Sequence, residues 1–247
     1  AATWFANVAE NLQSRCGIDY SVAQIPLMPI ANMTIGGIPT DESGRVVNGG
    51  WDSAVKGLFA AGDAACSGLH GAALNSGDHL LGAITSGETA GSAAATHASS
   101  SKFSGSSELS FALTEAHHDH DSMLSSSGSD GVSAGTIQSS LATTMQTHMG
   151  MSRSANGLAQ AAASIQQLQE TAVALSDPSP VMNTELVNVL RTQSLLSVAA
   201  AAVSAAQARE ESRGNHIRSD FPTTDAEPPS HSLTSMDGTV TSLPLRS

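Results

Sequence analysis

The sequence is poor in aromatic residues and in positive charge, and each shortage excludes a class of protein. Aromatic residues make up 3% of the 247 residues, so a core has to be built from Ala, Leu, Ile, Val and Met. Ten Lys and Arg residues face 22 Asp and Glu residues, which gives a formal net charge of -12. This balance argues against nucleic acid as a partner and against a polybasic membrane-surface protein, because both rely on clustered cations. The acidic charge otherwise favours solubility.

Cysteine is equally scarce. Cys16 and Cys66 form no CxxC or Cys/His spacing, so we expect no structural zinc site and two buried free thiols, as in a reducing compartment. The run His117 to Asp121 (H-H-D-H-D) contains good metal ligands. Within a Ser- and Gly-rich stretch, however, a solvated polar segment is the favoured explanation of this run. We predict no metal site.

Long apolar runs are absent too. The longest candidate, Leu195 to Ala206, is Ala-rich and shorter than the roughly 20 residues that span a bilayer. No signal or transit peptide is recognisable. The chain begins with Ala rather than Met, which suggests a processed N-terminus or a fragment.

The hydrophobic pattern predicts an α/β part followed by an all-α part. We expect a helix over residues 2–16, a short buried strand over 57–61 and a helix from about Asp78, its N-cap, to Ala95. Three amphipathic helices follow, ending near Met149, Leu175 and Arg209, and we expect an antiparallel bundle. The expected segments are 1–97 (α/β), 98–133 (low-complexity loop or disordered insertion), 134–209 (helical bundle) and 210–247 (extended tail).

The segment Gly57 to Ala65 (G-L-F-A-A-G-D-A-A) carries the first chemical signal. A strand that ends in Gly-Asp places a carboxylate at its C-terminal end, where α/β folds bind ligands. Taken alone, the same residues fit a surface turn.

Further blocks stand in a fixed order around this segment. They are I-P-L-M-P-I-A-N-M-T-I-G-G-I-P-T-D-E-S-G (25–44), C-S-G-L-H-G-A-A-L-N-S-G-D-H-L-L (66–81), L-A-T-T-M-Q-T-H-M-G-M-S-R (141–153), N-T-E-L-V (183–187), A-R-E-E-S-R-G-N-H-I-R-S-D-F-P (208–222) and S-H-S-L-T-S-M-D-G-T-V (230–240). The ordered set resembles the C-terminal half of the flavoprotein subunit of succinate dehydrogenase and fumarate reductase, over nearly the whole chain apart from the insertion. L-aspartate oxidases share the E-S-R-G block, but the last block favours the succinate dehydrogenase branch.

The resemblance implies the C-terminal part of an FAD-binding, Rossmann-like domain, then a three-helix bundle and an extended tail. The chain has no G-x-G-x-x-G segment for the FAD pyrophosphate, so a separate chain carrying the N-terminal half is implied. The other implied partners are an iron–sulfur subunit and, indirectly, membrane anchors. The implied reaction is oxidation of succinate to fumarate with electrons passed to iron–sulfur clusters and quinone. The implied place is the matrix side of the mitochondrial inner membrane, with a bacterial cytoplasmic membrane face as the alternative.

The resemblance also assigns residues to the FAD. Gly36 and Gly37 would lie against the flavin, and Asp63 stands where the family has a Glu that binds the FAD ribose. His79 and Leu80 match the start of a helix whose N–H groups face the flavin O2, where a helix N-terminus favours negative charge.

Two departures put the substrate site in doubt. Asn32 stands where the family has a substrate-binding His, and Leu74 where it has an Arg that holds a substrate carboxylate. His70 is kept, either to hydrogen-bond FAD or substrate or in a structural role. Arg213 and Arg218 are weak catalytic candidates; a charge cluster at a helix end is the alternative.

Three hypotheses remain open. The chain is one half of a split flavoprotein subunit, a non-catalytic relic of that subunit in a respiratory assembly, or part of another FAD enzyme of the superfamily. A less charged substrate would suit Leu74 in the third case.

Overall fold

The computed structural model of the chain describes residues 6–28, 30, 33–75, 77–102, 105–125, 131–225 and 228–245. The chain divides into two compact units, residues 1–30 and 31–247. In the first unit, α1 (Ala6–Asn11) continues as a π-helical segment, Leu12–Cys16. Gly17 ends it with φ 67°, and its N–H donates to the carbonyl of Gln13 at 3.1 Å. The predicted helix is therefore confirmed over residues 6–16, and its first residues lie outside the described ranges.

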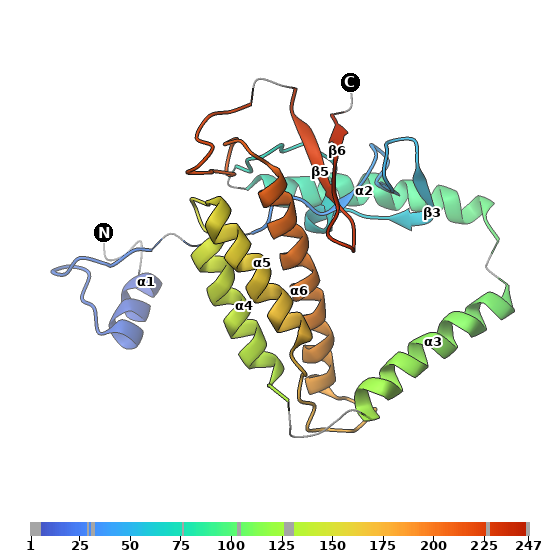
Figure 1. Cartoon of the computed structure of the whole chain (residues 1–247), viewed down its shortest axis with the longest axis horizontal. Coiled ribbons are helices and arrows are strands. Elements are labelled where there is room, and N and C mark those ends of the chain that lie inside the picture. The colour runs from blue at the N-terminus through green and yellow to red at the C-terminus, as the bar shows by residue number, and fades with distance from the viewer. Residues whose placement is uncertain are drawn as a thin grey trace. The chain divides into compact units, whose positions relative to one another are not determined.

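The second unit opens with an α/β part that contains two small strand pairs (Figure 1). Strands β1 (Ile38–Pro39) and β4 (Ala65–Cys66) pair in parallel, and β2 (Arg45–Val47) pairs with β3 (Ala54–Phe59) in antiparallel fashion. Helix α2 (Asp78–Ser100) contacts β3 and a 3-10 turn, Gly62–Ala64. The N-cap of α2 is Gly77 rather than the predicted Asp78.

The strand expected over residues 57–61 exists as β3, but the prediction that it is buried was wrong. Val55 is 38% exposed and Leu58 is 51% exposed. The strand partner of β3 in the described chain is the three-residue β2. A two-stranded ribbon cannot bury both faces of its strands, so β3 remains open to solvent or to a further polypeptide.

Three helices form the all-α part: α4 (Ala134–His148), α5 (Ala155–Glu170) and α6 (Thr184–Ala208). Each begins at a polar N-cap whose side chain accepts a backbone N–H: Ser133, Ser154 and Asn183. The helices pack on one another around a common core. Its buried residues are Ile137, Leu141, Ala161, Ile165, Leu196, Ala199 and Val203.

Within the described residues, one helix, α6, is long and apolar enough to cross a membrane. Its most apolar window has a mean hydropathy of 1.4. The sequence analysis predicts no apolar stretch long enough to span a bilayer. Thr192, Leu196 and Val203 of α6 are buried, and α6 contacts both α4 and α5. Core packing therefore explains the buried face of α6, whereas Val187 and Val198 are 62% and 58% exposed.

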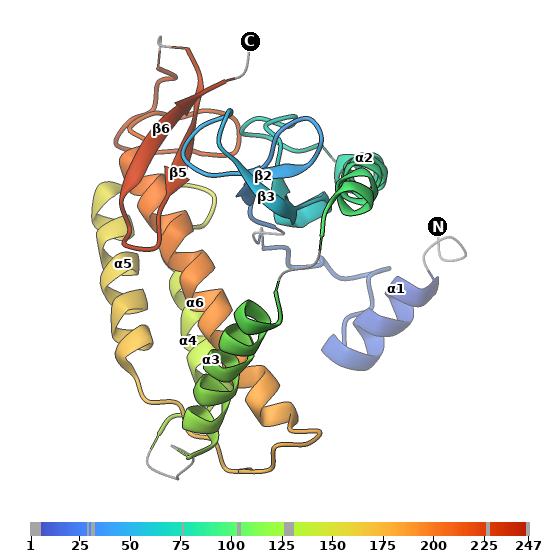
Figure 2. The same ribbon diagram turned by 90° about the vertical axis from the view of Figure 1, so that its right-hand side faces the viewer.

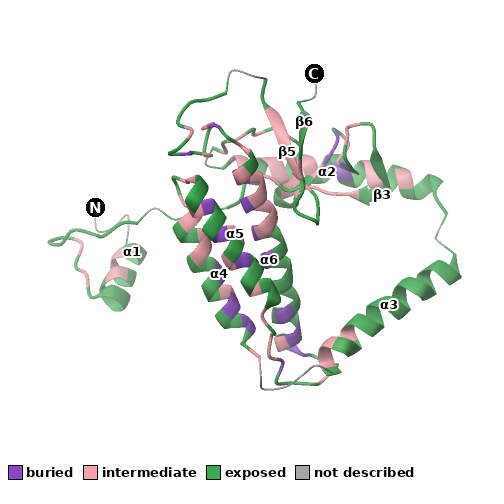
Figure 3. Cartoon of the chain, viewed as in Figure 1, coloured by how far each residue is buried: buried purple, intermediate pink, exposed green. Residues whose placement is uncertain are grey.

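The insertion that was predicted to be a loop or a disordered segment contains a further helix. Residues Ser106–Ser125 form α3, whose side chains are mostly exposed (Figure 3). Met123 and Leu124 at its C-terminal end pack against a second buried cluster, which holds Leu175, Leu186 and Val189. The first half of α3 contains Glu108, Leu109, Ala112, Leu113 and Glu115, which have high helix propensity, and this outweighed the polar composition on which the prediction rested.

The predicted extended tail is instead a β-hairpin with a regular register. Strands β5 (Ser230–Thr234) and β6 (Val240–Pro244) pair from Ser230↔Pro244 to Thr234↔Val240. Both strands contact α6, and Figure 2 shows the hairpin beside the end of that helix. The hairpin thereby joins the α/β part to the helices.

Candidate functional site

An open groove of about 540 Å³ lies in the α/β part, between the end of β3, the loop that follows β4 and the start of α2. Loop residues 33–36 form another wall, and the C-terminal hairpin contributes His231. Apolar side chains from three segments line it: Met33, Ile35, Leu69, Leu74 and Leu245. The groove thus collects residues from both ends of the second unit.

The two glycines of the predicted flavin turn differ in their surroundings. A Cβ on Gly37 would lie 2.6 Å from the carbonyl oxygen of Ala64, so this glycine allows the turn to approach the chain's own backbone. Gly36 lines the groove, with φ 134° and nothing within 4 Å of its Cβ position. Gly36 therefore offers open backbone to a ligand, whereas Gly37 serves the internal β1–β4 contact.

Asp63 and the start of α2 lie on the same groove. Asp63 is exposed in the turn after β3, and the Gly62 N–H donates to Ser86 Oγ at 2.9 Å, which ties this turn to α2. His79 lines the groove, but Leu80 does not, and the Leu80 N–H donates to the Gly77 carbonyl at 3.2 Å. The structure therefore brings Gly36, Asp63 and His79 to one site and leaves Leu80 outside it.

His70 and Leu74 also line the groove. The His70 Nε2 lies 3.2 Å from the position of a Cβ on Gly82, so that glycine leaves room on α2 for the imidazole. Leu74 is half-buried in the loop that follows. Asn32, the other departure from the family pattern, lies outside the described residues.

Sequence reasoning missed two aromatic groups of the site, Trp51 and His231. Their rings meet edge to face, with centroids 5.6 Å apart, and the Trp51 Nε1–H donates to the Pro244 carbonyl at 2.8 Å. Burial and then the charge of Arg209 lower the pKa of His231. His231 is the second residue of the last sequence block and Trp51 stands out in an aromatic-poor chain, but their separation along the sequence hid the contact.

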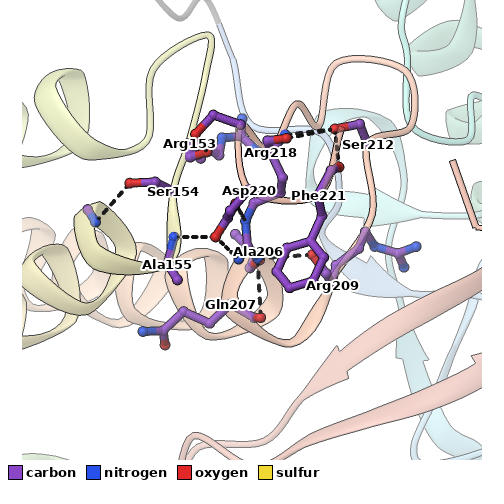
Figure 4. A network of polar contacts seen from close by, with 12 residues as sticks. Arg153, Ser154, Ala155, Ala206, Gln207, Arg209, Ser212, Arg218, Asp220 and Phe221 are labelled. Atoms are coloured by element: carbon purple, nitrogen blue, oxygen red, sulfur yellow. Dashed lines mark hydrogen bonds and ion pairs between the residues drawn. The ribbon is translucent and has the colours of Figure 1, made fainter. Parts of the chain in front are cut away.

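Arg218 lies in a polar network at the junction of α5 and α6, not in the groove (Figure 4). It is 2% exposed, and its Nε and Nη2 donate to the two carboxylate oxygens of Asp220 at 2.8 Å each. Its Nη1 donates to the carbonyls of Ala206 and Arg209 at 3.1 Å, which caps the C-terminal end of α6. Asp220 in turn accepts from the Ala155 N–H at 2.7 Å, at the start of α5.

Arg213 takes part in a second network that holds the hairpin. Glu211 lies 2.6 Å from Arg209 and 2.9 Å from Arg213, and Arg209 also donates to the Ser230 carbonyl at 2.6 Å. Burial alone would raise the pKa of Glu211. Hydrogen bonds from the two guanidinium groups and one backbone N–H outweigh burial and lower this pKa to about 2. The contacts of Arg213 and Arg218 are thus structural.

Replacing Glu211 with Gln should flatten the acid limb of the stability profile. The folded-state pKa is about 2 against 4.5 in the unfolded chain, so the stabilisation is present above pH 4.5 and is lost as the pH falls through 2. We expect Glu211→Gln to cost on the order of 2 kcal/mol at neutral pH and little at pH 2. Urea unfolding at several pH values measures this, with exposed Glu210→Gln as the control; parallel profiles for wild type and Glu211→Gln would contradict it.

No cluster of three or more His, Cys, Asp or Glu side chains that could hold a metal occurs in the described ranges. His117–Asp121 lies on α3, where the His120 Nδ1 is 3.4 Å from Asp121 Oδ1. The prediction of two buried thiols was wrong: Cys16 is exposed and Cys66 is half-buried. Burial raises the pKa of the Cys66 thiol.

The chain resembles known flavoproteins over most of its length. Residues 138–244 match the family described as fumarate reductase flavoprotein C-term, and residues 3–80 match the FAD binding domain family. The succinate dehydrogenase flavoprotein subunit of Rickettsia bellii is 32% identical over 237 residues, which cover 93% of this chain and 39% of that protein. The chain belongs to the succinate dehydrogenase and fumarate reductase flavoprotein family.

Other relatives of this flavoprotein chain give the same picture. The fumarate reductase flavoprotein subunit of Mycobacterium tuberculosis (strain H37Rv) is 32% identical, over 85% of this chain and 36% of that one. A solved Escherichia coli quinol fumarate reductase chain matches with a TM-score of 0.83 and 25% identity, over 96% of this chain and 40% of that one. The flavoprotein chain therefore spans about 40% of the length of these relatives.

The residues of the groove fit FAD, the cofactor that the family match and the flavoprotein relatives support. Gly36 offers open backbone, Asp63 offers a carboxylate to ribose hydroxyls, and the N-terminal end of the 23-residue α2 favours negative charge.

Proposed function

We propose that this chain forms the flavin-facing wall of an FAD-dependent oxidoreductase of the succinate dehydrogenase class. The groove that joins Gly36, Asp63 and the start of α2 carries the proposal. The part of the site that holds the FAD pyrophosphate lies outside these 247 residues. The names of the relatives refer to succinate dehydrogenase and quinol fumarate reductase. We propose oxidation of succinate to fumarate, with electrons passed to iron–sulfur clusters and quinone, as the activity of the complete protein.

Bound FAD would supply the two-electron acceptor, and the chain's own residues would hold it. The Asp63 carboxylate accepts hydrogen bonds from ribose hydroxyls, and charge-assisted bonds of this kind are the stronger ones. The imidazoles of His70 and His79 face the same groove, each with a ring N–H for a ligand oxygen.

An exposed apolar surface supports the proposal that a further polypeptide binds next to the groove. Leu80, Leu81 and Ile84 at the start of α2 are 63%, 64% and 62% exposed, and β3 exposes Val55 and Leu58. The three α2 residues lie within five positions of one helix, and exposed apolar surface of this kind marks an interaction site. We propose that the pyrophosphate-holding half of the flavoprotein, on a separate chain, covers it.

The proposed enzyme class implies further partner subunits. We propose an iron–sulfur subunit that receives the electrons and, through it, membrane-anchor subunits, as the name of the E. coli quinol fumarate reductase relative suggests. Relatives include mitochondrial subunits of Xenopus laevis and bacterial ones. We place the protein at a respiratory membrane, on the matrix side in mitochondria or the cytoplasmic face in bacteria.

Replacing Asp63 with Asn tests the flavin assignment. We expect the complete flavoprotein to hold FAD about tenfold less tightly, because a charged acceptor of ribose hydroxyls is lost. The measurement is flavin absorbance retained after gel filtration at several FAD concentrations. Asp52→Asn, in the exposed loop before β3, is the matched control. Equal retention by both variants and the wild type would count against the assignment.

A second candidate function is a non-catalytic member of the family, and Leu74 in the groove favours it. Reduction of dichlorophenolindophenol by the complete assembly, measured with succinate and with butanoate as substrates, separates the two. A flavin-containing assembly that reduces the dye supports the enzyme, whereas an assembly without flavin or turnover supports the second candidate.

A further inference from the structure

The ionisable side chains of the groove are mainly acidic or neutral. Among the described lining residues they are three carboxylates and three imidazoles: Asp41, Glu42, Asp63, His70, His79 and His231. Burial lowers the pKa of His231, which keeps its imidazole neutral near pH 7. A ligand with two negative charges would therefore meet carboxylates and neutral rings on this wall.

The guanidinium groups around the groove are already paired. Arg45 contacts the buried Asp41 carboxylate at 2.6 Å. Arg209 and Arg213 share Glu211 at 2.6 and 2.9 Å. Each of these cations would have to leave a carboxylate within the chain before it could bind one on a ligand.

The middle of the groove wall is apolar. Leu74 is half-buried, between His70 in the same loop and the start of α2, and it lines the groove together with Leu69 and Ile35. A carboxylate placed against Leu74 would lose its hydration without gaining a counter-ion or a hydrogen-bond donor, which is unfavourable. An alkyl group in the same place would be stabilised by apolar contact.

From this wall we infer that the substrate presents an uncharged, apolar end to Leu74 rather than a carboxylate. This inference rests on the proposed function, because it takes the groove as the ligand site beside the flavin. It departs from the relatives, whose names refer to succinate and fumarate, two dicarboxylates. Leu74 is the specificity-determining residue of this account.

The test compares the complete flavoprotein with its Leu74→Arg variant. Binding of butanoate, with one carboxylate, and of succinate, with two, is measured by the change each causes in the flavin absorbance. We expect the wild type to bind butanoate more tightly. Leu74→Arg should bind succinate about tenfold more tightly than the wild type does, because a guanidinium pairs with the second carboxylate. Leu190→Arg, on the exposed face of α6, controls for net charge.

The outcomes are distinct. Tighter binding of butanoate by the wild type, with a gain for succinate only in Leu74→Arg, supports the inference. Tighter binding of succinate by the wild type overturns it while the flavin signal leaves the proposed function intact. Equal gains in Leu74→Arg and Leu190→Arg also overturn it. A complete protein that lacks flavin overturns the proposed function itself.

Discussion

Replacing Arg218 with Ala should lower the free energy of unfolding by about 2–4 kcal/mol, because a buried guanidinium group that donates two hydrogen bonds to a carboxylate is lost. The side chain is 2% exposed, and it serves the Asp220 carboxylate and two carbonyls at the end of α6. Without it, a carboxylate and the last turn of α6 lose their donors. Because Asp220 also accepts the Ala155 N–H, the loss reaches the start of α5.

Denaturant unfolding of the complete protein measures this effect. Arg191→Ala is the matched control: Arg191 is exposed on α6, and a surface change of this kind should stay within about 0.5 kcal/mol. Arg218→Lys keeps the charge without the planar fork and should fall between the wild type and Arg218→Ala. A loss below that of Arg191→Ala would contradict the structural role of this arginine.

Replacing Gly214 with Ala should disturb the groove from a distance. Gly214 has φ 57°, and a Cβ there would lie 2.5 Å from the carbonyl oxygen of Ala72. The next residue, Asn215, donates its N–H to that same oxygen at 2.8 Å. Ala72 lies between His70 and Leu74 in the groove wall, so relief of the clash has to move that wall.

We expect Gly214→Ala to cost about 2–4 kcal/mol, of which about 1–2 kcal/mol is the left-handed conformation itself. Gly238→Ala isolates that share, because Gly238 has φ 82° and nothing within 4 Å of its Cβ position. Thermal unfolding and flavin retention of the two variants are compared. If both variants lose equal stability and retain equal flavin, the contact with Ala72 does not shape the groove.

The helices of the all-α part could be predicted because periodic apolar residues follow clear N-caps such as Ser154 and Asn183. Helix α3 was missed because composition was weighed above helix propensity. The exposure of β3 was missed because an apolar strand is ordinarily buried, and here the described residues leave it exposed.

The candidate site was predictable only where a local motif marked it. Gly36, Asp63, His70 and His79 stand in such motifs, and all four line the groove. Trp51 and His231 meet through a hairpin at the far end of the chain, which no local pattern encodes. Arg213 and Arg218 looked like candidates by motif, but their hydrogen bonds lie within the chain's own networks.

The central claim is that this chain supplies the flavin-facing wall of a flavoprotein site. An experimental density map of the complete flavoprotein purified with FAD tests it most directly. The account predicts isoalloxazine density in the groove beside Gly36, with the FAD ribose at Asp63 and the ring facing the start of α2. Solvent alone, or the surface of an unrelated polypeptide, in that groove would contradict it.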